Sequence, residues 1–454
     1  MKAKGPPTGG SRPAPKWTIG SILLAGLAIR EAFSFWTGHP YDFEVWVRTA
    51  YVVAHGENPY TSFWPAVPGV SFAYLGQPLP SAAYLPLWPA LLGELYRLWS
   101  AVGGGNRFVL YFLLKQPGIL ADIGTAWLLY RLGERWSGER RVGVLLAASW
   151  SFFPYAILIT AVWGEFDSLV VMIVLAILWS ASSRDRAVYN GLGILAKWLT
   201  VIFLPWEFFR ARGARRAYVG LSLAIAAAAS AALFVAEGWS FTGIQSTGLS
   251  ESHGGGYGMN YAYLFNLPVA APLGGVPMLF TIIGYLWVPG VLAAGWVAAR
   301  WVETERPVGV LRGLLLVVTA FLILRAGLYE QYLLYLFAPL LLDVTIYHPG
   351  RRPLFAGLLG VSWAYLILNN DLLIRFVSPL SPSVTTFTTA LDASSTFGVF
   401  RLYALAVLAV VMTISLAQLA VVLVRDRPAP TVWWWSVGRA VRRWAGSTIA
   451  ERRR

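Results

Sequence analysis

Two carboxylates, Asp42 and Glu44, lie two residues apart in the polar stretch 39–46, directly after an apolar segment over 17–36. An ionisable side chain at the mouth of a membrane span is costly to place there, so such a residue marks a functional site by default. A carboxylate held at the aqueous face of a membrane can take the proton of an approaching hydroxyl group. We therefore predict that Asp42 is a catalytic base and that Glu44 is an accessory acid. The alternatives are that Asp42 only caps a helix or pairs with Arg48, and that Glu44 is a solvated loop charge.

Five further charged residues lie inside or at the mouths of apolar segments: Glu165, Asp167, Lys115, Lys197 and Arg325. A departing phosphate group needs fixed positive charge, so the three basic residues are candidates for binding the phosphate of a lipid-linked substrate. The two acidic residues are accessory candidates that would orient an acceptor or support Asp42. A second interpretation holds for Lys115 and Asp122, which are seven residues apart on roughly one helical face: both could pair with other charges and fix helix packing.

The composition places these residues in a membrane protein. Of the 454 residues, 57% are hydrophobic and 13% are charged, against roughly 25% charged in soluble domains, and the mean hydropathy is +0.58. The absence of cysteine excludes disulfides, cysteine-ligated zinc, iron–sulfur clusters and thiol catalysis. The net charge of +14 comes largely from arginines in short loops and in the tail, as in cytoplasmic anchoring, so no nucleic-acid partner is expected. The tryptophan- and arginine-rich, cysteine-free composition favours a prokaryotic plasma membrane.

Loop charge orients the predicted membrane segments. Residues 1–16 form a basic, disordered cytoplasmic start, and 425–454 form a basic cytoplasmic tail in which the tryptophans at 433–435 indicate an interfacial helix. The long first loop, over about 37–105, then lies on the extracytoplasmic face together with Asp42. We predict an all-α polytopic membrane protein with both termini cytoplasmic. Its ten or so full transmembrane helices are expected over 17–36, 108–130, 143–161, 168–182, 217–236, 274–298, 309–325, 332–346, 354–370 and 398–424.

Two apolar segments do not fit as simple spans. Residues 83–100 are interrupted by two prolines, and only one crossing fits between the outer loop and the next basic loop, so this segment is predicted to be an amphipathic helix on the outer leaflet. Residues 188–208 begin and end beside basic clusters and contain Lys197 and a proline, which predicts a broken, re-entrant hairpin. The catalytic membrane module is expected over 17–346, followed by C-terminal transmembrane helices over 347–424.

A glycine run at 254–256 lies in a predicted outer loop. It lacks the strand-to-helix context of a nucleotide site, so we interpret it as a flexible loop, or as a loop that gates an acceptor together with His253 and Asn260. Since no phosphate-cradling glycine loop faces the cytoplasm, a nucleotide-binding site is not expected there.

Five collinear groups of motifs between residues 38 and 340 resemble one family. They are Asp42-Phe-Glu-Val-Trp with Gly56-Glu-Asn-Pro-Tyr, Asp122-Ile-Gly-Thr-Ala-Trp with Leu-Tyr-Arg-Leu, Gly164-Glu-Phe-Asp-Ser after Pro154, Gly193-Ile-Leu-Ala-Lys with Leu204-Pro205, and Glu330-Gln331-Tyr332-Leu-Leu-Tyr335. The pattern is similar to class C (GT-C) polyprenyl-phosphate-sugar-dependent glycosyltransferases. In particular, it resembles the catalytic subunit of the GPI-anchor first mannosyltransferase and its prokaryotic relatives.

The resemblance implies a GT-C fold and an inverting transfer. In that family a sugar, mannose in the most similar members, passes from a dolichyl or polyprenyl phosphate to an acceptor hydroxyl at the extracytoplasmic face. The acceptor would be a glycan, a glycolipid or a protein. The matched motifs imply that Lys197 is the first candidate for the donor phosphate and that Gln331 and Tyr332 lie on the acceptor side. No cofactor is implied with certainty: a divalent metal would need paired acids, and Pro40 replaces the first aspartate of the family's Asp-x-Asp, with Glu44 as a partial substitute.

Two other functions fit part of the pattern. A transporter or flippase for a lipid-linked or anionic substrate would explain buried charges and a broken hairpin, but not the long outer loop or the carboxylate beside the first span. A non-catalytic partner subunit of an enzyme complex would leave Asp42 dispensable.

Overall fold

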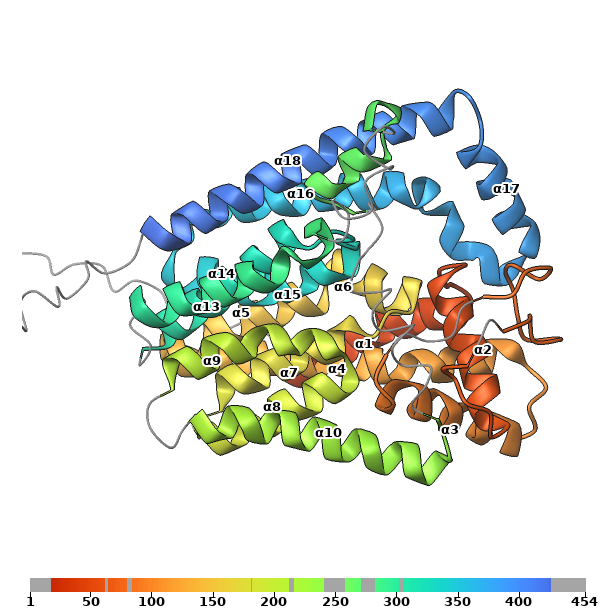
Figure 1. The fold of residues 1–454 in the computed structure, drawn as a ribbon, viewed down its shortest axis with the longest axis horizontal. Coiled ribbons are helices and arrows are strands. Elements are labelled where there is room, and N and C mark those ends of the chain that lie inside the picture. Colours follow the sequence, from red (N-terminus) through yellow and green to blue (C-terminus); the bar gives the residue numbers. More distant parts are fainter. Residues whose placement is uncertain are drawn as a thin grey trace, which may run out of the picture.

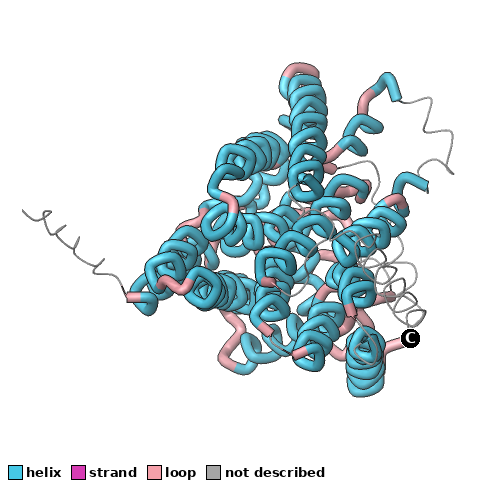
Figure 2. Tube along the Cα trace, turned by 90° about the vertical axis from the view of Figure 1, so that its left-hand side faces the viewer, coloured by secondary structure: helices cyan, strands magenta, loops and turns pink. Residues whose placement is uncertain are grey.

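Helices form most of the chain that the computed structural model describes, as Figures 1 and 2 show. The described residues are 18–61, 64–79, 84–180, 182–211, 216–240, 258–270, 282–301 and 306–425. Within them the pairing of Trp64 with Leu79 is a single antiparallel bridge, and no longer strand occurs. The prediction of an all-α protein is therefore confirmed for this part. The predicted basic start at 1–16, the tail segment 433–435 and the loop with His253 lie outside the described residues.

The predicted outer loop contains two helices that pack on each other. After α1 (Ile19–Ser34), the chain forms α2 (Asp42–Ala54) and α3 (Leu87–Ala101). The buried residues Trp88, Leu92 and Tyr96 recur at every fourth position of α3, which gives the helix one apolar face. Trp88 packs edge-on against Trp46 of α2, and Tyr96 packs edge-on against Tyr51. The predicted amphipathic helix is thus present, with its apolar face against α2, while its position on a membrane surface remains a prediction.

The next two helices pack closely because glycines lie at their contact. They are α4 (Arg107–Ser137) and α5 (Arg140–Ser151). The Asn106 side chain caps the start of α4 by accepting a hydrogen bond from the backbone N–H of Phe108 at 2.9 Å. A Cβ atom on Gly143 would lie 2.5 Å from the carbonyl oxygen of Tyr130, so no larger residue fits at that position. This contact fixes α5 against the centre of the bundle.

A bent segment follows α5 and ends in a tight turn. The chain bends by 44° and continues as Pro154–Trp163, which consists of α6 (Pro154–Ile157) and the π-helical turn η1 (Leu158–Trp163). A proline disfavours helical backbone at the residue before it, which explains the bend at Phe153. Gly164, with φ of +97°, then reverses the chain into α7 (Asp167–Trp179). The turn predicted at 163–167 is confirmed.

The segment predicted as a broken hairpin is interrupted at Lys197. It comprises α8 (Ser183–Ala196), the 3-10 turn η2 (Trp198–Phe203) and α9 (Leu204–Arg210), and it leads into α10 (Ala217–Glu237). Lys197 has extended backbone angles (φ −151°, ψ 114°), which end α8. Pro205 lies in the first turn of α9, where its missing N–H costs no helical hydrogen bond. The predicted break is confirmed, and its entry into a membrane remains a prediction.

The remaining elements complete the bundle. They are η5 (Tyr261–Asn266), α13 (Trp287–Trp301), α14 (Pro307–Leu324), η7 (Glu330–Leu333), α15 (Leu334–Leu342), η8 (Asp343–Tyr347), η9 (Pro349–Arg351), α16 (Arg352–Asn369), η10 (Asp371–Leu380), α17 (Pro382–Asp392) and α18 (Phe397–Arg425). In Figure 1 most long helices run along the long axis, with α16 and α18 at one edge and α10 at the other. The largest apolar cluster joins residues of α4 to α7 with residues of α14, α15, α16 and α18. The predicted module over 17–346 and the helices after it therefore share one core.

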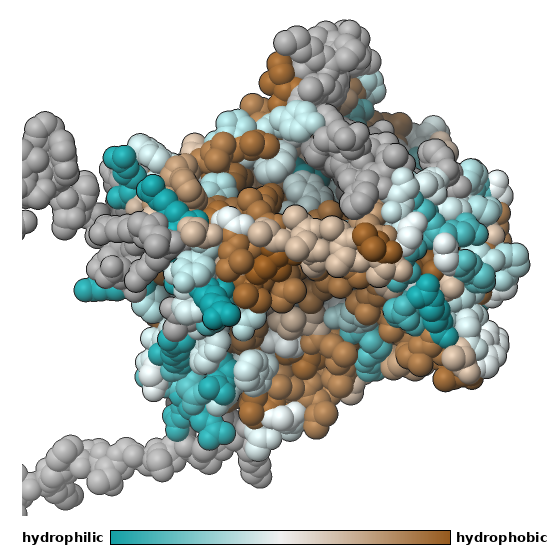
Figure 3. Space-filling view, turned by 60° about the horizontal axis from the view of Figure 1, so that its bottom comes forward, coloured by the Kyte–Doolittle hydropathy of each residue, from teal (hydrophilic) through white to brown (hydrophobic). Residues whose placement is uncertain are grey.

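Four helices of the described part are long and apolar enough to cross a membrane: Ala217–Glu237, Ile282–Arg300, Pro307–Leu324 and Phe397–Arg425. The count rises to six if two bent pairs, Arg140–Ser151 with Pro154–Trp163 and Pro349–Asn369 with Asp371–Leu380, each form one span. Figure 3 shows a broad apolar surface between hydrophilic ends, as expected for a protein surrounded by lipid. The structure thus supports a membrane protein with four to six such helices, while ten full spans and the GT-C fold are not confirmed.

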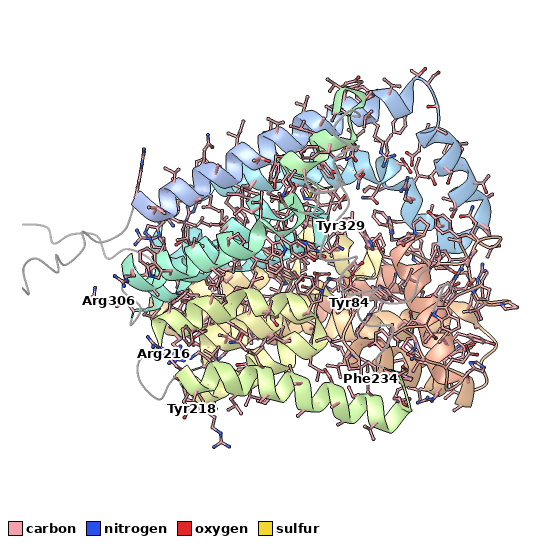
Figure 4. The ribbon with its side chains drawn as sticks, in the orientation of Figure 1. Tyr84, Arg216, Tyr218, Phe234, Arg306 and Tyr329 are labelled. Carbon is pink, nitrogen blue, oxygen red and sulfur yellow. The ribbon has the colours of Figure 1, made fainter. Side chains whose placement is uncertain are left out.

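Two labelled arginines mark one end of the bundle, and two helices of the predicted outer loop mark the other. Arg216 and Arg306 lie at the left end in Figure 4, which we call the basic end, whereas Tyr84 and Tyr329 lie nearer the middle of the long axis. The helices α2 and α3 lie at the opposite end (Figure 1), which we call the loop end.

Candidate functional site

Asp42 is held by a tryptophan and a histidine. Its Oδ2 accepts a hydrogen bond from the indole Nε1–H of Trp163 at 2.9 Å and lies 2.9 Å from Nδ1 of His39. The His39 ring stacks on the Trp163 indole with centroids 4.6 Å apart, and the backbone N–H of His39 donates to the carbonyl of Trp163 at 2.9 Å. Asp42 begins α2, but its side chain makes no capping hydrogen bond, and Arg48 pairs with Glu44 instead. Neither predicted alternative for Asp42 therefore matches its contacts.

The second oxygen of Asp42 is available to a further partner. The side chain is 28% exposed, and Oδ1 has no hydrogen-bond partner among the described residues. Burial raises the pKa of Asp42, but the charge of His39, hydrogen bonds from His39 and Trp163, and the charge of Lys197 lower it by more. The net pKa lies below the usual value of 3.8, so Asp42 is an ionised carboxylate at neutral pH.

The turn after Trp163 fits closely against the start of α2. A Cβ atom on Gly164 would lie 2.5 Å from the ring of Phe43, and the positive φ of Gly164 also favours glycine. Glu165, predicted as an accessory acid, is 2% exposed in this turn, and its backbone N–H donates to the carbonyl of Ile159 at 3.1 Å. The turn then delivers Asp167 to the first position of α7.

Asp167 and Lys197 form a buried ion pair beside this turn. The Lys197 Nζ lies 3.0 Å from Oδ1 and 2.9 Å from Oδ2 of Asp167, and both side chains are fully buried. The Tyr335 hydroxyl also donates to Oδ1 of Asp167. The break between α8 and η2 places Lys197 here, because an extended residue in a helical hairpin turns its side chain out of the helical array. Two predicted site residues from separate motifs are thus joined directly.

Three aromatic rings surround the ammonium group of Lys197. Its Nζ lies 5.0 Å from the ring centroid of Tyr84, 4.9 Å from that of Phe166 and 5.2 Å from that of Tyr332. Such contacts stabilise a desolvated cation by about 2 kcal/mol or more each. Trp163 donates to Asp42 and begins the turn that leads to Asp167, so the carboxylate and the ion pair are joined through one turn of the chain. The charge of Lys197 also lowers the pKa of Asp42.

Arg325 approaches the same site from the end of α14. Its Cζ lies 5.5 Å from the centroid of Tyr332, so Lys197 and Arg325 both contact that ring. Two further rings pack against the guanidinium, those of Trp198 and Phe321. Asn260, predicted as an acceptor residue, donates its side-chain amide to the carbonyl of Arg325 at 2.6 Å and thereby fixes the backbone of this residue. Asn260 is completely buried, so its role in the site is to hold the backbone of Arg325.

Glu44 and Lys115 lie apart from the Asp167–Lys197 pair and have local roles. Glu44 is buried, its Oε1 lies 2.8 Å from Nε of Arg48, and its Oε2 accepts from the backbone N–H of Phe72 at 3.0 Å. The alternative that Glu44 is a solvated loop charge is therefore wrong. The Lys115 Nζ donates to the carbonyls of Thr37 and Ala161 at 2.7 and 2.8 Å. These bonds fix the chain that leads to His39. Lys115 therefore packs through backbone carbonyls and not through the charge pairing predicted as its alternative.

Asp122, the other residue with a predicted packing role, forms a buried pair with Arg30. The Arg30 guanidinium lies 2.7 Å from Oδ2 of Asp122, and Trp150 donates its indole N–H to Oδ1 at 2.6 Å. Both charged side chains are fully buried. The pair joins α1 to α4 and α5, and the sequence interpretation missed Arg30.

A small pocket of about 260 Å³ opens beside Glu330. Its lining contains tyrosines, amides and charged groups: Tyr263, Tyr329, Tyr365, Asn266, Asn369, Glu330 and Arg401. Asn369 donates to Oε1 of Glu330 at 2.7 Å, while burial raises the pKa of Glu330 and the charge of Asp42 raises it further. Gln331 and Tyr332 follow Glu330 in the chain and are both buried.

The residues around Asp42 do not fit a divalent metal. Among the described residues, no three carboxylate or imidazole groups come together in a way that would hold a metal ion. Asp42 has His39 beside it, whereas Mg²⁺ and Ca²⁺ prefer several oxygen ligands. We therefore derive no step that uses a metal.

Several residues of the site were missed by the sequence interpretation as functional groups. His39, Trp163, Tyr84 and Tyr335 all contact a predicted site residue. His39 is three residues before Asp42, a spacing that one helical turn brings together, so this signal was present in the sequence. Trp163 lies 121 residues from Asp42 in the chain, and no local pattern indicates that contact.

The comparison with protein-family models finds no match for this chain, and the comparison with curated proteins finds no match either. The chemistry of the site must therefore be argued from its geometry. The site combines an ionised carboxylate that has one oxygen available, a buried cation beside aromatic rings, and a second cation on the same tyrosine. Such a set can deprotonate a hydroxyl group and stabilise an anionic leaving group.

Proposed function

We propose that this chain is an inverting glycosyltransferase that moves a sugar, with mannose as the first candidate, from a polyprenyl or dolichyl phosphate to an acceptor hydroxyl. The acceptor is a glycan, a glycolipid or a protein. The proposal includes a GT-C fold with about ten spans in a prokaryotic plasma membrane, both termini in the cytoplasm, and the site on the extracytoplasmic face.

One observation carries the proposal: residues from four separate motifs form a connected set. Asp42 contacts Trp163, which begins the turn that leads to Asp167. Asp167 contacts Lys197 and Tyr335. These motifs are the ones whose order along the chain resembles the polyprenyl-phosphate-dependent family.

The proposed reaction needs one base and one phosphate site. Oδ1 of Asp42 takes the proton of the acceptor hydroxyl as the hydroxyl oxygen forms a bond to the anomeric carbon. The bond between that carbon and the phosphate oxygen breaks at the same time, and the electron pair leaves with the lipid phosphate. Lys197 and Arg325 are both fully buried, so their positive charges stabilise the negative charge on this phosphate through the electrostatic field of the site, while the rings around them exclude water. Attack from the face opposite the phosphate inverts the anomeric centre.

The pocket beside Glu330 is the acceptor site in this proposal. Its tyrosine rings offer apolar surfaces for the face of a sugar, and its amide and carboxylate groups offer hydrogen bonds to sugar hydroxyls. A volume of about 260 Å³ suits one or two sugar units. We place the acceptor in this pocket because Glu330 lines it and because the charge of Asp42 raises the pKa of Glu330.

The test is transfer of radiolabelled mannose from dolichyl-phosphate-mannose to lipid or peptide acceptors by membranes that contain the protein. We expect Asp42→Asn to lower transfer by about 10²-fold to 10⁴-fold, since it removes a general base and leaves the shape of the side chain intact. The matched control is Glu57→Gln, which neutralises an exposed carboxylate just after α2.

Normal transfer by the Asp42→Asn protein would exclude Asp42 as the base. If the wild-type protein transfers no sugar from any polyprenyl donor, the enzyme proposal fails, and the transporter or flippase becomes the better interpretation.

A further inference from the structure

A second and larger pocket, of about 1050 Å³, lies at the basic end of the bundle. Its lining includes five arginines and one glutamate: Arg135, Arg186, Arg210, Arg216, Arg300 and Glu207. The net charge of these six side chains is four positive charges. The proposed transfer reaction uses none of them.

Aromatic side chains hold three of the arginines in place. The Arg216 guanidinium lies 5.1 Å from the ring centroid of Phe208, and that of Arg300 lies 5.0 Å from the ring of Trp296. Arg135 packs at 5.0 Å against Trp179. Arg135 and Arg216 also donate one N–H each to the backbone carbonyls of Trp179 and Ala211, at 2.9 and 3.3 Å. A guanidinium carries five N–H groups, so one such bond positions the group and leaves further donors that suit phosphate oxygens.

The pocket lies where membrane-spanning helices end. Arg216 directly precedes the span Ala217–Glu237, Arg300 ends the span Ile282–Arg300, and Pro307 begins the span Pro307–Leu324, and all three residues line the pocket. The aromatic residues Phe208 and Trp296, which also line it, are each 41% exposed. The cationic pocket thus lies at the level of a membrane surface, with an apolar rim. Figure 4 shows Arg216 far along the long axis from Tyr84, which belongs to the Asp42 site.

We propose that this pocket binds the headgroup of an anionic phospholipid. A phosphodiester headgroup matches the arginines, and the acyl chains of the same molecule match the exposed aromatic and apolar surface beside it. Basic pockets between helix ends bind lipid headgroups in other membrane proteins for the same physical reason. Free phosphate carries the same negative charge, but it has no acyl chains that could pack against the apolar rim. This site is independent of the proposed transferase activity.

The experiment uses the full chain, purified in detergent and depleted of lipid. Phosphatidylglycerol or phosphatidylcholine in mixed micelles is titrated in, and the melting temperature and the number of retained lipids by native mass spectrometry are followed. We expect phosphatidylglycerol to bind saturably and raise the melting temperature, whereas phosphatidylcholine does neither. The variant Arg216→Gln with Arg300→Gln removes two exposed arginines of the pocket and should weaken phosphatidylglycerol binding about thirtyfold.

The control variant Arg140→Gln with Arg141→Gln removes the same charge from two exposed arginines outside the pocket and should bind phosphatidylglycerol as the wild type does. Equal weakening of phosphatidylglycerol binding in both double variants would show that the effect comes from net charge, and it would overturn the pocket as the binding site. Inorganic phosphate that raises the melting temperature as much as phosphatidylglycerol does would overturn the lipid as ligand. If the pocket double variant does not fold, the single Arg216→Gln protein, expected to bind about fivefold more weakly, decides the same question.

Discussion

The protonation state of Asp42 is set by a few identifiable contacts. Burial alone would raise its pKa and favour the neutral acid. His39, Trp163 and Lys197 act in the opposite direction, and together they outweigh burial. In the proposed transfer reaction the carboxylate is therefore already ionised when the acceptor binds, and no separate step is needed to activate it.

The pH dependence of transfer tests this account. Since the pKa of Asp42 is lowered, the acidic limb of kcat/KM should lie below pH 3.8. Trp163→Phe removes one hydrogen bond to the charged carboxylate, worth about 1.5–3 kcal/mol, so the pKa should rise by about one unit or more and the limb should move to higher pH. The same carboxylate also contributes to stability. Because its pKa is lower in the folded protein than the usual value of 3.8, it stabilises the folded protein above pH 3.8, and this contribution is lost as the pH falls through the lowered pKa. The variant Trp127→Phe, at a 42% exposed position on α4, should leave the limb unchanged. A profile that does not move in Trp163→Phe would contradict the contact.

The buried pair of Arg30 and Asp122 gives a prediction about stability. Asp122→Ala leaves the Arg30 guanidinium buried without its carboxylate, which should lower the free energy of unfolding by about 3–5 kcal/mol. The double variant Arg30→Met with Asp122→Leu should recover most of this loss, because no buried charge remains. Denaturation in detergent micelles measures both values. A double variant as unstable as the single one would show that the loss comes from packing and not from the unpaired charge.

The helical elements were predictable wherever a local signal marks a boundary. The break at Lys197 and the turn at Gly164 were both identified, since a lysine or a glycine interrupts an apolar run at those positions. The corner between α16 and α17 was not predictable. Its residues Asp371, Leu372 and Leu373 have φ values of 51°, 57° and 70°, although leucine has no preference for this region. Packing imposes that backbone, and no residue type in the sequence indicates it.

This corner gives a prediction at the level of the element. Leu372 is 56% exposed, so Leu372→Gly removes little buried surface and relieves about 1–2 kcal/mol of backbone strain. Glycine also makes the unfolded chain more flexible, which offsets about 0.5–1 kcal/mol. We expect a melting temperature that is unchanged or slightly raised. Leu98→Gly is the matched control, because Leu98 is 50% exposed in the regular helix α3 and should lose about 1 kcal/mol. A loss in Leu372→Gly as large as in Leu98→Gly would contradict the left-handed conformation.

At the scale of the whole molecule, composition and charge determine the class of the protein but not the number of spans. Helices α1 and α4 cover two predicted spans, yet α1 has 16 residues and α4 contains Lys115 and Asp122. Such charges look incompatible with lipid until their partners are known. Asp122 pairs with Arg30, 92 residues away, and Lys115 binds two backbone carbonyls. Contacts over such distances in the chain determine which helices form the bundle interior, and they leave no trace in hydropathy.

The membrane orientation that we predict from loop charge can be tested directly. Arginines gather at the basic end, and positive loops remain on the cytoplasmic side, so the loop end should face outward. The chain has no cysteine, so single cysteines can be introduced without a background. Glu57→Cys, exposed just after α2, should react with a membrane-impermeant maleimide on intact cells. Arg140→Cys, exposed at the start of α5, should react only after the membrane is permeabilised. The reverse pattern would place Asp42 on the cytoplasmic side, where a nucleotide-sugar donor becomes accessible and the argument for a lipid-phosphate donor loses its basis.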